Sequence, residues 1–198
     1  QKIYYASSDS VRHAMDLPQC EEVRARGYEI IYLDLAIDQM VLEQLRDHDG
    51  KTFCNVMTDD LGFDTEEDKK AAEEQNEENK ELLDYLKESL GERVAKVRLT
   101  NKLVSKPSAL STEGPITLEM ERYFRVSPSE EMQKIRAVRV LEINANHHAF
   151  EAIKEAYEAD DKEKAANYAK ILAAAAELVS GVELQEPGEF VSLISELL

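Results

Sequence analysis

The sequence predicts a small α/β subdomain with a short, mainly parallel sheet, followed by an α+β domain that ends in a helical bundle. Three observations predict this fold class. In residues 1–63, β-branched and aromatic runs alternate with helix-like segments, which is the βαβ pattern of a parallel sheet. Residues 64–81 are strongly acidic and separate the two parts. After them come short strand candidates and then a continuous helical run, an order typical of α+β domains.

The strand candidates of the first part are "KIYYAS", "YEIIYL" and the weaker "TFCNVM". Two helical segments, "SDSVRHAMDL" and "PQCEEVRARG", separate the first two strands, with Pro18 suited to a helix start and Gly27 to a helix end. The next helix is predicted from Ile37 to Arg46, opened by Asp34 or Asp38 and followed by the turn "DHDGK".

The Ile37–Arg46 helix carries an apolar stripe. Ile37, Val41 and Leu45 recur at helical spacing, so we expect them to form its buried seam, with Met40 and Glu43 toward the flank.

Residues 64–81 contain nine acidic and three basic residues and no aromatic residue. This composition predicts a solvated connecting helix or a flexible linker. We therefore expect one domain at 1–63, a connection at 64–81 and a second domain at 82–198. The second domain opens with the helix "LLDYLKESLG", which Gly91 ends.

The second domain has strand candidates in "VAKVRL", "SALST" and "VRVLEI". Between the last two strands, the helix Ile116–Val126 carries a stripe of Met and aromatic residues, with Glu119, Glu121 and Arg122 opposite. The stripe consists of Ile116, Met120, Tyr123 and Phe124. Such a stripe usually packs in a core. The flanking "STEGP" and "SPSEE" also allow a mobile helix that turns the stripe outward, where Met and aromatic side chains suit adaptable binding.

The chain ends in two helices joined by a turn that contains Gly and Pro. Their apolar residues are Tyr168, Ile171, Leu172, Ala175, Ala176 and Val179 in the first helix, and Phe190, Val191, Ile194, Leu197 and Leu198 in the second. This pair can fold back on its own domain or form a four-helix bundle with a second copy, and the residues alone leave both arrangements open.

Two adjacent histidines, His147 and His148, precede the first helix of the final run. Consecutive helical positions point about 100° apart, so we expect the two rings to lie on different faces. His147 and Glu151 have the i, i+4 spacing of a zinc site, but a third ligand is missing. We interpret the pair as the first turn of a helix capped by Asn144 or Asn146. A metal-dependent or hydrolytic enzyme centred on His147, His148 and Glu151 is the rival reading.

Composition restricts the possible partners. A net charge of −17 repels phosphate backbones, which argues against nucleic acid. No apolar run approaches the roughly 18 residues of a membrane span. The sequence allows a disulfide between Cys20 and Cys54, but we predict two buried reduced thiols in a cytoplasmic protein. The start "QKIYYASS" lacks an initiator Met, so we expect a piece of a longer protein.

We find no GxSxG, P-loop or GxGxxG motif and predict no enzyme, catalytic residue, metal or cofactor in this piece.

Several strings resemble the heat shock protein 90 chaperone family, in its bacterial form. They are "IYYASSDS", "RGYEIIYL", "AIDQMVLEQLRDHDGKTF", "LGERVAKVRLTNKLVSKPSAL" and "RVLEINANH". The similarity runs in order through nearly all 198 residues, and "VRLTNKLV" and "VLEINANH" are its most specific parts. The resemblance implies the end of the middle domain, within 1–63, followed by the C-terminal dimerisation domain. ATP and Mg would bind the full-length protein only, outside this piece.

The resemblance also implies roles for the apolar surfaces. The two final helices would form a homodimer's four-helix bundle. The 116–126 helix would contact incompletely folded client proteins through Ile116, Met120, Tyr123 and Phe124, facing Met40 and Glu43.

This sequence departs from the family pattern at several positions. Met40 stands where an aromatic residue is common, and Ala36 and Ala145 replace prolines of the family. The chain ends in "ISELL" without a Met-Glu-Glu-Val-Asp tail, so tail-dependent cochaperone docking is not expected.

Overall fold

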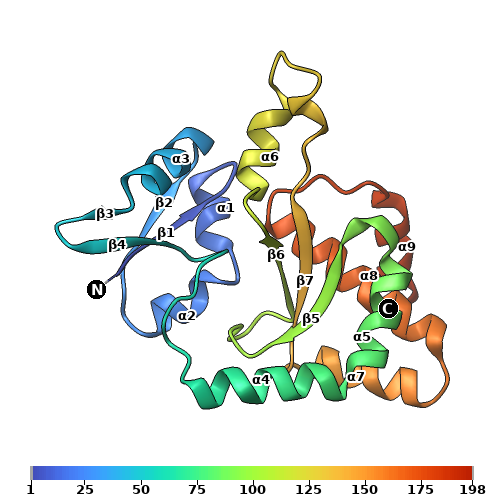
Figure 1. Ribbon diagram of the computed structural model, residues 1–198. Helices are drawn as coiled ribbons and strands as arrows, with labels where there is room; N and C mark the ends of the chain where they lie inside the picture. Colours follow the sequence, from blue (N-terminus) through green and yellow to red (C-terminus); the bar gives the residue numbers. More distant parts are fainter. Residues whose placement is uncertain (1, 198) are drawn as a thin grey trace. The chain divides into compact units, whose positions relative to one another are not determined.

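The structure is a computed structural model that describes residues 2–197 (Figure 1). It has a mixed α/β fold with two small sheets. The chain divides into two compact units. The first comprises the chain up to Phe63 together with Ser111–Val138, and the second comprises Asp64–Leu110 and the chain from Arg139 onward.

The sheet of the first unit has the order β2-β1-β4-β3. It is built from β1 (Lys2–Ser7), β2 (Ile30–Leu33), β3 (Asp47–His48) and β4 (Lys51–Asn55). Strand β1 pairs in parallel with both β2 and β4, which confirms the predicted parallel sheet. The expected turn "DHDGK" is part of a hairpin, because β3 pairs antiparallel with β4 and the chain reverses at Asp49 and Gly50, both at positive φ.

Three helices accompany this sheet: α1 (Val11–Asp16), α2 (Cys20–Ala25) and α3 (Ala36–Leu45). Gly27, at a φ of 79°, follows α2 as predicted. The predicted cap of α3 was wrong, because Leu35 occupies the N-cap and no side chain caps the helix. Asp34 lies one residue too early to cap, and Asp38 lies in the first turn, where its carboxylate complements the helix dipole.

The core of the first unit contains both cysteines as free, buried thiols, as predicted. Burial raises the pKa of Cys20 to about 12 and that of Cys54 to about 11. A thiol with such a pKa is protonated at neutral pH and is a poor nucleophile and metal ligand. Both cysteines therefore act as small apolar core residues here, alongside Tyr5, Leu17 and Val23.

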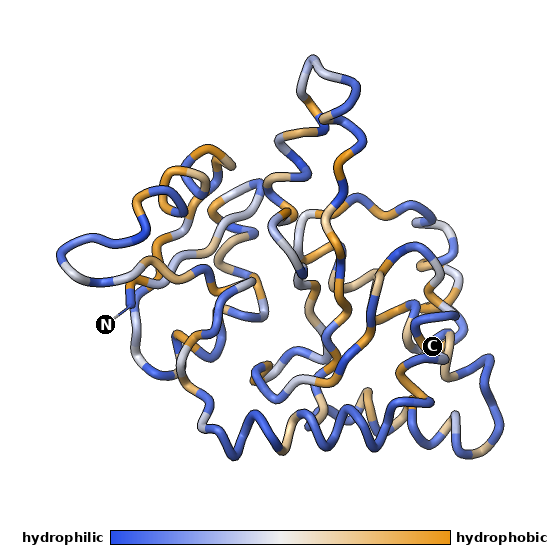
Figure 2. The backbone as a smooth tube through the Cα atoms, in the orientation of Figure 1, coloured by the Kyte–Doolittle hydropathy of each residue, from blue (hydrophilic) through white to orange (hydrophobic). Residues whose placement is uncertain are grey.

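The acidic segment forms the helix α4 (Glu66–Glu78). Thr65 accepts from the backbone of Asp68, and Asp68 accepts from the backbone of Thr65, so a capping box begins the helix. No residue of α4 is buried, and its trace is mostly hydrophilic in Figure 2. Asn76 ties α4 to β5 within the second unit, because its side chain accepts from the Leu99 N–H at 2.8 Å and donates to the Leu99 carbonyl at 3.0 Å.

The second unit is built around the sheet β5-β7-β6. Its strands are β5 (Lys96–Thr100), β6 (Ser108–Glu113) and β7 (Val138–Asn144), and β5 runs parallel to β7. The chain leaves this unit through β6 and returns through β7. The helices are α5 (Lys80–Leu90), α7 (His148–Glu158), α8 (Lys162–Val179) and α9 (Pro187–Glu196). Short 3₁₀ turns lie at Gly91–Arg93 and Met132–Lys134.

The start of α7 corrects the prediction for the histidines. His147 itself is the N-cap, with its Nδ1 accepting from the Ala149 N–H at 3.1 Å. Asn144 instead donates to the carbonyls of Leu103 and Lys106, both at 3.0 Å. The His147 and His148 rings contact each other, with centroids 4.1 Å apart. The expected separation was wrong because His147 has extended backbone angles, so the helical 100° step does not apply to it.

Candidate interaction surfaces

Helix α3 buries its polar side and exposes its apolar stripe. Gln39 is fully buried, whereas Ile37, Val41 and Leu45 are 51%, 47% and 58% exposed. The predicted buried seam was therefore wrong. The predicted flank residues Met40 and Glu43 are half-buried. Figure 2 shows the hydrophobic residues of α3 along its trace.

Helix α6 (Leu118–Arg125) has the same inverted arrangement. Glu119 and Glu121 are only 4% and 2% exposed, while Tyr123 is 46% exposed. Ile116, Met120 and Phe124 are half-buried. The stripe of Met and aromatic residues is therefore neither fully enclosed in a core nor fully exposed, and Tyr123 is its most exposed member.

The buried acids of α6 are held by specific partners. Glu121 pairs with Arg125 at 3.0 Å and accepts from the Ala137 N–H at 2.8 Å. Glu119 lies 3.8 Å from Arg122. Burial raises the pKa of Glu119 to about 7; Arg122 opposes this rise, whereas the nearby carboxylates of Asp9 and Glu43 add to it. Glu119 thus changes its charge near neutral pH.

A polar contact joins α3 and α6 within the first unit. The Gln39 Nε2 donates to the Thr117 Oγ1 at 3.0 Å and to the Glu43 Oε1 at 2.8 Å. Thr117 is also the N-cap of α6, because its hydroxyl accepts from the Met120 N–H at 3.2 Å. A polar contact therefore joins the two helices, and Ile37, Val41 and Leu45 of α3 lie on the side of that helix away from Gln39.

The second candidate surface lies on α8 and α9, in the second unit. Of the residues predicted to form a dimer interface, Leu172 and Ala176 are buried in their own chain, five are half-buried and three are exposed. The half-buried ones are Tyr168, Ile171, Ala175, Val179 and Phe190, and the exposed ones are Val191 (62%), Ile194 (36%) and Leu197 (54%). Leu198 lies outside the described residues.

An ion pair and one further apolar residue also belong to this surface. Lys170 on α8 pairs with Glu189 on α9 at 2.8 Å, which ties the two helices together. Leu178 is 47% exposed and extends these apolar residues, although it was not among the residues predicted for this surface. Its helical spacing of seven from Ile171 was the available signal.

Chemistry-bearing residues do not gather into a reactive cluster in the described part of the chain. Within residues 2–197 no group of three or more His, Cys, Asp and Glu side chains is placed to hold a metal ion. The Nδ1 of His147 is occupied as a helix cap. No described helix is long and apolar enough to cross a membrane.

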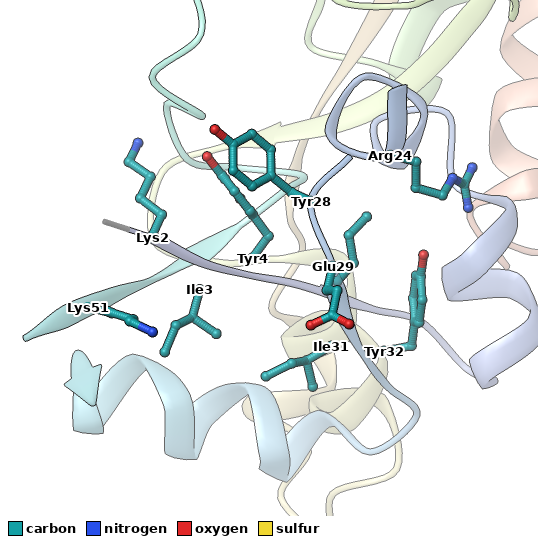
Figure 3. A pocket seen from close by; sticks show the side chains of 10 residues that line it. Lys2, Ile3, Tyr4, Arg24, Tyr28, Glu29, Ile31, Tyr32 and Lys51 are labelled. Atoms are coloured by element: carbon teal, nitrogen blue, oxygen red, sulfur yellow. The ribbon is translucent and has the colours of Figure 1, made fainter. Parts of the chain in front are cut away.

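An open pocket of about 670 Å³ lies along β2, in the first unit. Figure 3 shows that Tyr4 and Tyr28 lie on one face of the sheet and Ile3 and Ile31 on the other. Its lining is Lys2, Ile3, Tyr4, Arg24, Tyr28, Glu29, Ile30, Ile31, Tyr32 and Lys51. The lining combines aromatic, aliphatic and cationic side chains with one carboxylate, that of Glu29.

Comparison with known proteins assigns a family to this arrangement. The family model described as "Hsp90 protein" matches residues 1–198. "Chaperone protein HtpG" of Bacillus subtilis (strain 168) is 38% identical over 196 residues, which are 99% of this chain and 31% of that protein. The HtpG proteins of Bacillus velezensis and Clostridium acetobutylicum are 39% and 37% identical, with the same coverage. The chain thus spans about a third of the length of these relatives.

Proposed function

Because this chain belongs to the Hsp90 family, we propose that it is the part of an Hsp90-type molecular chaperone that joins two copies and contacts incompletely folded client proteins. One observation carries the proposal: Tyr123 is exposed on α6, and Val191 and Ile194 are exposed on α9, and gathered apolar side chains in water mark interaction surfaces. The names of the relatives describe chaperones, which supports the same function.

The homodimer is proposed to form through α8 and α9. Val191, Ile194 and Leu197 lie on the outward side of α9, and Ile171 and Leu178 lie on α8. Two copies of this helix pair would make a four-helix bundle, and a stable interface of this kind buries on the order of 1,600 Å² in total. The small side chain of the half-buried Ala175 would let a second helix approach closely.

Dimerisation would raise the effective concentration of the remaining domains of one copy around those of the other. Two copies joined at one end hold their remaining domains close together, so contacts between those domains become nearly intramolecular. We assign ATP and Mg binding, and ATP hydrolysis, to the rest of the longer protein. In this assignment residues 1–63 end the middle domain, 64–81 connect, and 82–198 form the dimerisation domain of a cytoplasmic protein.

Client contact is proposed at the stripe of α6, together with Met40 and Glu43 of α3. Met120, Tyr123 and Phe124 provide large, adaptable apolar area. Glu43 lies in the same polar contact that holds α6 to α3, through Gln39. A shallow surface of this kind favours weak binding of many apolar segments over tight binding of one.

Sedimentation tests the dimer. Ile171→Asp combined with Ile194→Asp should convert a dimer to a monomer at micromolar concentration, because burying two unpaired carboxylates opposes association. Val104→Asp is the matched control, since Val104 is 60% exposed on the loop before β6. A wild-type chain that is already monomeric at these concentrations would contradict the dimer.

Suppression of aggregation tests client contact. Met120→Ser, Tyr123→Ser and Phe124→Ser together should impair suppression of the aggregation of a heat-unfolded enzyme by about fivefold or more, because the apolar contact area is removed. The same variant should sediment as the wild type does. Unchanged suppression would overturn the assignment of client contact to α6.

A further inference from the structure

The outward face of α3 is the second exposed apolar surface of the first unit. It comprises Leu35, Ile37, Val41 and Leu45, which are 57%, 51%, 47% and 58% exposed, and adjoins Ile31 on β2, which is 44% exposed. Ile31 lies on the same face of the sheet as Ile3 (Figure 3). We call Ile31, Leu35, Ile37, Val41 and Leu45 the α3 face. A group of large apolar side chains left in water indicates a contact surface.

The α3 face does not coincide with the residues assigned to clients on this helix. Met40 and Glu43 are half-buried, and Glu43 is engaged by Gln39. Ile37, Val41 and Leu45 follow one another at steps of four, so they share one side of the helix. Gln39, on the other side, fastens the helix to Thr117. The polar contact with α6 therefore fixes α3 in the orientation that exposes the face.

The segment that carries the α3 face is acidic, whereas Lys2 and Lys51 line the pocket beside Ile31. Residues 29–49 contain six acidic residues and one basic residue, a net charge of −5. Asp34 is exposed and directly precedes Leu35, and Asp38 lies three residues before Val41, on the same side of α3. Acidic side chains beside an apolar surface favour a ligand that carries both apolar and basic side chains.

We propose that the α3 face binds apolar polypeptide segments of net positive charge. This inference rests on the proposed client-binding function and adds to it a second contact area and a charge preference. The ligand would lay its apolar side chains on Ile37, Val41 and Leu45, and its Lys or Arg side chains would reach Asp34 and Asp38. The whole chain has a net charge of −17, which attracts the same ligands over a longer range.

Two labelled peptides test the proposal by fluorescence anisotropy. Both are unstructured, about 20 residues long and equal in Leu and Phe content, but one carries Lys where the other carries Glu. The wild-type chain should bind the Lys peptide about tenfold more tightly in low salt, and the difference should shrink about threefold or more as salt screens the charges. Equal affinity for the two peptides would overturn the charge preference.

Variants locate the contact. Ile37→Ser, Val41→Ser and Leu45→Ser together should weaken binding of the Lys peptide about tenfold, and Asp34→Lys with Asp38→Lys should invert the preference between the peptides. Val11→Ser with Met15→Ser is the matched control, because these α1 residues are 42% and 46% exposed in the same unit. It should bind as the wild type does.

The outcomes separate this inference from the proposed function. If the α3 variant binds normally while the α6 variant Met120→Ser, Tyr123→Ser, Phe124→Ser loses binding, the α3 face is not a client surface and client binding itself stands. If the wild type binds neither peptide, both proposals fail. If the α3 variant changes sedimentation instead of peptide binding, the face contacts a second copy of the chain and the inference is wrong.

Discussion

Gln39 and Thr117 are 78 residues apart in the chain, and the Gln39 Nε2 donates to the Thr117 Oγ1 at 3.0 Å in a buried contact. This single bond joins the middle of α3 to the N-cap of α6. The exposed apolar residues Ile37, Val41 and Leu45 lie on the side of α3 away from this bond.

Removing the Gln39–Thr117 bond should loosen α6. Gln39→Ala removes the side-chain donor of the Thr117 hydroxyl, which keeps the Met120 N–H, and should destabilise the contact by about 1–2 kcal/mol. Thr117→Ser keeps both the bond and the cap and should cost less. Amide hydrogen exchange of residues 118–125 would measure the loss as reduced protection. Unchanged protection in Gln39→Ala would show that other contacts hold α6.

Ionisation of Glu119 should destabilise the first unit as the pH rises. Burial raises its folded pKa to about 7, above the ordinary value of 4.5, so the folded state favours the protonated acid. The stability this provides is complete below about pH 4.5 and is lost as the pH rises through 7, by up to about 3 kcal/mol. Glu119→Gln should remove this pH dependence. Urea unfolding from pH 5 to pH 8 measures it, with the exposed Glu130→Gln as control.

Removing only one partner of the Arg93–Glu177 ion pair should destabilise the second unit strongly. Glu177 is 3% exposed, and two nitrogens of Arg93 contact its carboxylate at 2.6 and 3.4 Å. Arg93→Ala leaves a buried carboxylate without this partner and should destabilise the second unit by about 3–5 kcal/mol. Adding Glu177→Leu should recover most of that loss. Thermal unfolding of the two variants makes the comparison, and equal melting temperatures would contradict it.

His147 should behave as a helix cap. His147→Ala removes the acceptor for the Ala149 N–H and should cost about 0.5–2 kcal/mol, whereas His147→Asn should be nearly neutral. Partial burial and the neighbouring His148 lower the pKa of His147 below 6.5, so the folded state favours the neutral ring. The cap should therefore contribute fully above pH 6.5 and weaken as the pH falls. A denaturant series at pH 5 and pH 8 would show a smaller effect of His147→Ala at pH 5.

The order and type of most helices and strands could be predicted from the sequence, because period-2 and period-3.6 patterns are local. The exceptions are β3, which was expected to be a turn, and α4, for which a flexible linker was also left open. Gly27 and Gly91 ended their helices as expected, at positive φ. The orientation of α3 could not be predicted in this way. Its sequence pattern showed one apolar side, which we expected to be buried. The side that contains Gln39 is buried, and Gln39 bonds to Thr117, which is 78 residues away in the sequence.

The residue that caps α7 could not be predicted from the local sequence, because it depends on tertiary contacts. Asn is the more frequent cap, so Asn144 and Asn146 were the reasonable expectation. Asn144 is instead held by the carbonyls of Leu103 and Lys106, which belong to a distant loop. For the candidate surfaces, the apolar spacing located α6, α8 and α9, whereas the fraction of each side chain that remains exposed depends on tertiary contacts.

The excess of acidic residues has a practical consequence for anyone who handles this molecule. Electrostatic repulsion between like-charged copies opposes their association through the exposed apolar surfaces. At the isoelectric point, near pH 4.7, that repulsion vanishes while the patches persist. The turbidity of a solution should therefore be highest near pH 4.7. Mild acidification should aggregate the folded protein before the acid unfolds it.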